Sequence, residues 1–170
     1  MNKLKRHTII GIIFVLITGT LSHFVYEWSD NNTLAGFLFP INESVWEHMK
    51  LVFFPMLLYS FYMIAKLDSD FPCSAATTMF GVLLGTFLVP ILFYTYSGFL
   101  GYTTRFFDIG TFVISVLLSF WVIYKLTLSC KLASYEAALK TLVLVMAMCF
   151  FLFTYQPLDI GIFAEPGSKQ

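Results

Sequence analysis

Long apolar runs separated by short polar segments dominate the pattern of hydrophobic and polar positions along the chain. A helix needs about 20 mostly apolar residues to cross a bilayer, and in lipid each backbone polar group has to be satisfied within its own segment. The pattern therefore predicts an all-α, polytopic transmembrane helix bundle, with residues 1–170 forming a single transmembrane domain. Five spans are expected, at about residues 8–26, 45–66, 75–96, 106–124 and 137–155.

The composition agrees with a membrane protein. The chain is 58% hydrophobic and 12% charged, whereas a soluble domain is about 25% charged. We expect a multi-pass protein of the cell membrane, surrounded by membrane lipid. The formal net charge is zero, which gives no electrostatic basis for binding nucleic acid.

Lys and Arg residues are unevenly divided between the two sides of the predicted bundle. Seven of the ten lie on the side of the N-terminus, and only Lys50, Arg105 and Lys169 lie on the other side. Because cytoplasmic loops carry the excess of Lys and Arg, the N-terminus is expected inside and the C-terminus outside. Cys73 and Cys130 then fall on the inner side, where thiols stay reduced, so these two and Cys149 are expected to be free thiols.

Two outer segments contain apolar residues but are too short to span the bilayer. The outer loop, residues 29–44, begins with turn-forming residues and continues with an apolar stretch that ends at Pro40. This pattern suggests a re-entrant or interfacial segment over the outer face. Residues 157–166 mix Asp159 with apolar side chains and could fold back onto the same face.

The end of the first span carries a polar stripe. Gly19, His23 and Glu27 are spaced i, i+4, i+8, so they share one face of a helix. A glycine allows close approach of a neighbouring helix. A His–Glu pair one turn apart can bind a metal ion or act as a base with its orienting partner. Alternatively, His23 is a buried side chain that hydrogen-bonds to Glu27 and fixes helix packing.

A second polar cluster, the string N-E-S-V-W-E-H at residues 42–48, opens the second span. Ser44 followed three residues later by Glu47 has the spacing of a capping box, and carboxylates are favoured at the positive end of the helix dipole. Capping explains Ser44 and one carboxylate. It does not explain why Glu43, Glu47 and His48 occur together.

Asp108 lies near the outer start of the fourth span, three residues after Arg105. Such a pair is often a salt bridge along one helix face. The alternative is that Asp108 points inward and completes the polar cluster, while Arg105 binds an anionic head group or stabilises developing charge.

The strings S-H-F-x-Y-E-W-S, P-x-N-E-S-x-W-E-H-x-K and a closing P-x-x-x-x-x-F-x-x-P together resemble a family of small bacterial integral membrane proteins, domain-of-unknown-function family 6512. The resemblance covers most of the chain. It implies a membrane location and about this number of helices, and it implies no activity.

Two imidazoles and several carboxylates at one face of the bilayer favour a membrane-embedded, metal-dependent hydrolase that acts on an amphipathic or lipid-like substrate at the outer face. Zinc suits two His and one carboxylate, and iron or manganese suits the same ligands. The chain lacks specific metal motifs such as H-E-x-x-H. The predicted metal ligands are His23, Glu27 and His48, and the predicted catalytic residues are Glu43, Glu47 and Asp108.

Three other functions fit the same residues. Intramembrane carboxylates and histidines also occur in a small transporter or an ion- or ligand-binding membrane protein. Ser44 and His48, one turn apart, could form a metal-free nucleophile and base. In a structural membrane protein, the polar cluster would only tie helices together.

Overall fold

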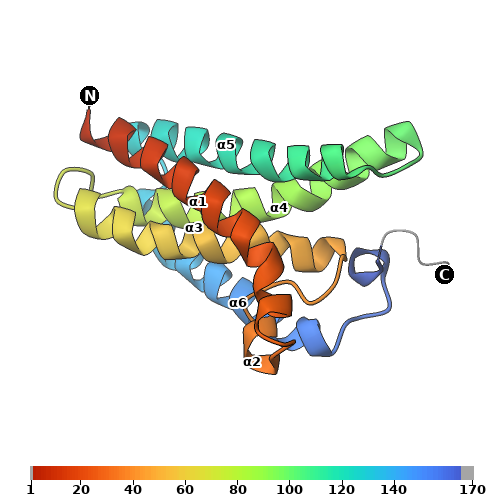
Figure 1. The fold of residues 1–170 in the computed structure, drawn as a ribbon. Helices are drawn as coiled ribbons and strands as arrows, with labels where there is room; N and C mark the ends of the chain where they lie inside the picture. Colours follow the sequence, from red (N-terminus) through yellow and green to blue (C-terminus); the bar gives the residue numbers. More distant parts are fainter. Residues whose placement is uncertain (1, 166–170) are drawn as a thin grey trace.

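The computed structural model describes residues 2–165, and within this range the chain is entirely helical (Figure 1). Asn2, Asn32, Ser44 and Thr104 each place a side-chain oxygen on a backbone N–H of the helix that follows, as N-caps do. The elements are α1 (Lys3–Trp28), α2 (Thr33–Gly36), α3 (Val45–Leu67), α4 (Ser74–Leu100), α5 (Arg105–Ser129), η1 (Ala133–Tyr135), α6 (Glu136–Tyr155) and η2 (Gly161–Phe163).

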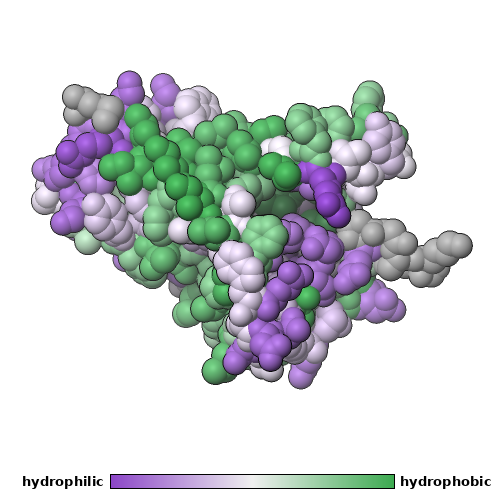
Figure 2. All heavy atoms as spheres, viewed as in Figure 1, coloured by the Kyte–Doolittle hydropathy of each residue, from purple (hydrophilic) through white to green (hydrophobic). Residues whose placement is uncertain are grey.

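The five predicted spans are confirmed as five helices that are long and apolar enough to cross a membrane. Most extend several residues beyond the apolar runs. For example, α1 begins at Lys3 and α5 ends at Ser129. Figure 2 shows hydrophobic side chains across the middle of one face and hydrophilic ones gathered toward both ends, as expected for a protein that crosses a bilayer.

Helices α3 and α4 form the centre of the bundle. Helix α1 packs against α3 and α5, α5 packs against α4, and α6 packs against α4. Helix α1 approaches the α3 backbone closely at Gly19, because a Cβ at this position would lie 2.6 Å from the carbonyl oxygen of Leu51 and 2.7 Å from the ring of Phe112. The glycine thus sets the spacing of α1, α3 and α5 just below the polar stripe.

The end of the bundle where α1 ends and α3 begins is called the site end. Here the α4–α5 hairpin extends beyond its neighbours (Figure 1). The buried positions of α4 stop at Val89, directly before Pro90, and Phe99 near the tip is 89% exposed. Gly101 closes α4 with a φ of +76°, a left-handed conformation that glycine adopts without strain. The hairpin therefore stands away from α1 and α3.

The outer loop contains the one-turn helix α2 and lies against the ends of α3 and α6. The hydroxyl of Tyr155 donates to the carbonyl of Thr33 at 2.8 Å, and Phe37 packs edge-on against Phe151 and Tyr155. The tail also folds back, since the Phe163 ring lies 4.9 Å from the ring of Trp46. Pro166 and Lys169 of the tail lie outside the described residues.

A buried ion pair attaches the outer loop to the bundle. Lys50 and Glu47 have side chains 0% and 2% exposed, and Lys50 Nζ lies 2.7 Å from Glu47 Oε2. The ammonium also donates to the carbonyl of Gly36 at 2.9 Å and to the hydroxyl of Thr154 at 2.6 Å. Glu47 Oε2 accepts from the backbone N–H of Ile41 at 3.0 Å. The outer loop, α3 and α6 are thus joined by the ion pair of Lys50 and Glu47.

We expect Lys50→Met to unfold the protein more readily, because it leaves the Glu47 carboxylate buried without its cation. Breaking a buried pair from one side costs about 3–5 kcal/mol. Thermal or denaturant unfolding in a neutral detergent measures the loss. The matched control is Lys140→Met, which removes an exposed pair with Glu136 and should cost about 1 kcal/mol or less. Equal losses in the two variants would contradict the role given to Lys50.

The expectation of three free thiols is wrong for Cys73 and Cys130, which the structure joins in a disulfide. Cys73 immediately precedes α4 and Cys130 immediately follows α5, so the antiparallel packing of these helices brings the two Cα atoms to 5.5 Å. This separation suits a disulfide. A separation of 57 residues in sequence gives no hint of it. Within the described residues, Cys149 is the free cysteine.

Thiol counting tests this pairing. A maleimide applied to denatured, unreduced protein should modify one cysteine per chain, and after reduction it should modify three. In the Cys73→Ser variant, unreduced protein should take up two labels, because Cys130 loses its partner. Three labels on unreduced wild-type protein would contradict the disulfide.

Candidate functional site

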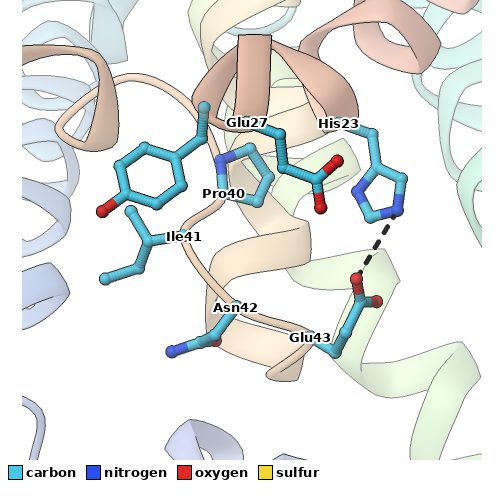
Figure 3. Close-up of a pocket in the computed structure, with 7 residues that line it drawn as sticks. His23, Glu27, Pro40, Ile41, Asn42 and Glu43 are labelled. Atoms are coloured by element: carbon cyan, nitrogen blue, oxygen red, sulfur yellow. Dashed lines mark ion pairs between the residues drawn. The ribbon is translucent and has the colours of Figure 1, made fainter. Parts of the chain in front are cut away.

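Helix α1, the outer loop and helix α3 bring together His23, Glu43 and His48. One ligand-type atom from each of the three side chains lies within 4.8 Å of the others, as in a group that could hold a metal ion. Figure 3 shows Glu43 rising from the loop toward the His23 ring on α1. These three residues are called the His/Glu cluster. Two of the predicted metal ligands, His23 and His48, thus lie together, with ring centroids 5.4 Å apart.

The cap of α3 fixes the ring of His48. Ser44 is the N-cap, and its hydroxyl accepts from the N–H of Glu47 at 3.3 Å. One turn later, His48 Nδ1 lies 2.9 Å from the carbonyl oxygen of Ser44. A carbonyl only accepts, so Nδ1 carries the proton. In a neutral ring, Nε2 therefore presents its lone pair to the carboxylate of Glu43, 3.3 Å away.

Glu43 bridges the two imidazoles with its two oxygens. Oε1 lies 3.7 Å from His23 Nε2, and Oε2 lies 3.3 Å from His48 Nε2. Two atoms that bind one tetrahedral ion at about 2.0–2.2 Å are about 3.3–3.6 Å apart. When Nε2 is also protonated, His48 donates a hydrogen bond to Glu43, and this bond holds the pKa of the Glu43 carboxyl below its ordinary value. The nearby charges of His48, His23 and Arg105 act in the same direction, against partial burial. Glu43 is thus held in its ionised, ligand-competent form.

His23 is less firmly held than His48. Its Nδ1 atom is buried and has no hydrogen-bond partner among residues 2–165. Metal-binding histidines usually donate their second ring N–H to a carbonyl or carboxylate. The orientation of His23 therefore depends on packing against Phe24, 5.2 Å away between ring centroids, and on Glu43.

Glu27 stands beside the His/Glu cluster, although it was the carboxylate predicted as a ligand. Figure 3 shows its carboxylate one turn beyond His23 and pointing into the same space, next to Pro40. Glu27 is exposed and lines a small pocket with His23 and Glu43. The structure thus places Glu43 between the two imidazoles and Glu27 at their edge.

Asp108 lies across from the cluster and is held by a neighbouring helix. The hydroxyl of Tyr96 on α4 donates a hydrogen bond to Asp108 Oδ1 on α5. Sequence spacing pointed instead to Arg105 as its partner, but within the described residues no ion pair joins Arg105 to Asp108. Both side chains line the cavity beside the cluster.

Glu47 is the one predicted catalytic residue that the structure keeps away from the others. Its carboxylate is occupied by Lys50, Ile41 and Thr154, and it does not line the cavity described next. The structure also places the Ser44 hydroxyl in the helix cap, where His48 contacts the Ser44 carbonyl. Sequence spacing could not separate these roles, because Glu43, Glu47 and His48 all occur within six residues.

A cavity of about 730 Å³ lies between α1, α3, α4 and α5 at the site end. Figure 2 shows a hollow in this face, bordered by hydrophobic side chains on one side and hydrophilic ones on the other. The apolar part of the cavity could not be predicted, since its residues resemble every other apolar position in the spans. Its ionisable lining residues are His23, Glu27, Glu43, His48, Arg105 and Asp108, and its apolar lining includes Leu51, Val89, Phe93 and Phe112.

The chain belongs to a family whose function is not established. Residues 1–169 match the model of the family of unknown function DUF6512, and this confirms the resemblance noted in the sequence. No curated protein and no solved structure matches the chain. Function therefore has to be argued from the His/Glu cluster and its cavity.

Proposed function

We propose that this protein is a membrane-embedded, metal-dependent hydrolase that acts on an amphipathic substrate. The observation that carries the proposal is the facing arrangement of His48 and Glu43. With the proton of His48 on Nδ1, its Nε2 lone pair and a carboxylate oxygen lie 3.3 Å apart, and two lone pairs in this position need a cation between them. A proton could lie between His48 Nε2 and the Glu43 oxygen. A metal ion could bind these two atoms and His23 as well.

Zinc is the ion that best suits the ligand set. Two imidazoles and one carboxylate, His23, His48 and Glu43, form the set of a catalytic zinc site that keeps a position open for water. Iron or manganese suits the same ligands. The ion would polarise a carbonyl or phosphoryl oxygen and make its bound water acidic.

Two carboxylates remain for proton transfer. Glu27 and Asp108 both line the cavity, from α1 and α5 respectively. One would accept a proton from the attacking water, and the other would donate a proton to the leaving group. Tyr96 holds Asp108 in place. Glu47 is assigned a structural role through Lys50.

The protein would work in the cell membrane with its site end outside. The distribution of Lys and Arg supports this orientation, and the burial of Lys50 strengthens the asymmetry, because a Lys paired inside the bundle is not a loop charge.

Metal analysis tests the ligand set. Wild-type protein purified in neutral detergent and exposed to zinc should retain about one ion per chain after dialysis. His48→Ala and Glu43→Gln should each lose most of it, because two remaining ligands bind far more weakly. The control is His7→Gln, since His7 lies near the opposite end of α1. Metal content near zero in both wild-type and His48→Ala protein would refute the site.

Activity measurements separate chemistry from metal binding. On a panel of single-chain esters, amides and phosphoesters, zinc-loaded protein should hydrolyse at least one class, and a chelator should abolish the activity. Glu27→Gln and Asp108→Asn should lower kcat about 10²–10⁴-fold while metal content stays unchanged. Full activity in both variants would remove these residues from the mechanism.

A further inference from the structure

The cavity beside the His/Glu cluster is polar at one end and apolar at the other. Ionisable side chains surround its outer part, and Leu51, Val89, Phe93 and Phe112 line the rest. Its volume of about 730 Å³ falls in the range of about 300–1,000 Å³ that is usual for small-molecule sites. A ligand that satisfies both ends has a polar group and a hydrocarbon chain.

The cavity lining reaches the outer surface of the bundle between α1 and α5. Near Gly19 and Phe112 these helices are in close contact. Beyond that point, Phe24 on α1 and Ile109 on α5 both line the cavity and are 41% and 64% exposed. Apolar side chains on this surface face lipid in a membrane. A molecule dissolved in the bilayer can therefore reach the cavity sideways.

Arg105 is the one permanently charged cation on the cavity wall, within the part of the chain that the structure describes. Asp108, three residues on, is bound by Tyr96 instead. No hydrogen bond or ion pair within residues 2–165 occupies the guanidinium, whose planar fork suits phosphate and carboxylate groups. The charge of Arg105 acts on Glu43, but its N–H groups, which make no hydrogen bond within residues 2–165, are available to an anion on a ligand.

Building on the proposed function, we infer that the substrate is an anionic amphiphile with a single hydrocarbon chain, whose phosphate or carboxylate group is bound by Arg105. The chain enters between Phe24 and Ile109 and lies along Leu51, Val89 and Phe112. This arrangement places the bonds next to the charged group beside His23, Glu43 and His48. The cavity is too small to enclose a two-chain phospholipid together with its head group.

Photolabelling in nanodiscs of zwitterionic lipid tests the inference. The probe is dodecyl phosphate with a photoreactive diazirine at the end of its chain, and the matched neutral probe is the same chain ending in an alcohol. The anionic probe should label peptides around Val89 and Phe112 at saturable concentrations. In Arg105→Gln its half-saturation concentration should rise about 10- to 100-fold, as expected for loss of a charge-assisted hydrogen bond.

Three controls make the result specific. Arg105→Lys, which keeps the charge, should lie between wild type and Arg105→Gln. Lys125→Gln, far from the cavity on α5, should behave as wild type. Inorganic phosphate should displace the probe much less well than unlabelled dodecyl phosphate, because it cannot occupy the apolar end.

Several outcomes would overturn the inference. These are an unchanged half-saturation concentration in Arg105→Gln, equal labelling by the neutral probe, and displacement by inorganic phosphate as effective as by dodecyl phosphate. The same titration on chelator-treated protein and on His48→Ala separates the two proposals. Arg105-dependent labelling without metal would support the inference even if the metal site failed. Bound metal without such labelling would refute the inference alone.

Discussion

The buried ion pair between Lys50 and Glu47 is the interaction on which the site end depends. A charged side chain inside a membrane bundle has to be paired, because its desolvation is costly. Here the three donors of the ammonium are taken up by Glu47, by Thr154 on α6 and by the carbonyl of Gly36 in the outer loop. The loop is therefore fixed at Gly36 and again at Ile41, two residues before Glu43. The position of Glu43 between two imidazoles follows from this attachment.

Hydropathy predicted the five spans because a bilayer dictates the length and polarity of whatever crosses it. It also predicted that His23 and His48 lie at the same end of the bundle, since one is near the end of the first span and the other near the start of the second. The choice between Glu43 and Glu47 was beyond the sequence. Both flank the cap of α3 one turn apart. Glu47 meets Lys50 because the two are three residues apart on α3, whereas the path of the loop places Glu43 beside the two imidazoles. The cavity could not be predicted from the sequence either. It forms because the end of the α4–α5 hairpin lies apart from α1 and α3, and the hydropathy of a span does not indicate how far it lies from its neighbours.

The disulfide and the distribution of charges bear differently on orientation. Packing of α4 against α5 places Cys73 next to Cys130 in either orientation of the bundle, so the fold alone explains why the two residues are close. Whether the two cysteines stay oxidised depends on the compartment, because disulfides persist mainly in oxidising compartments. The excess of Lys and Arg at the same end favours the cytosol. The disulfide lies at the end of the α4–α5 hairpin opposite the cavity.

The lower boundary of the cavity bears on whether the proposed site is a reaction chamber or part of a transport path. A path for ions or solutes needs polar groups through the whole thickness of the bundle. Below the cavity, α1 closes onto α3 and α5 at Gly19 and again at Gly11, where an added Cβ would meet the rings of Phe120 and Tyr59. Between these contacts, Val15 and Val116 are fully buried. The ionisable groups thus open toward the site end and the lipid, and close packing of α1 at Gly19 and Gly11 separates them from the opposite end. This geometry favours chemistry on a molecule that enters and leaves by the same side.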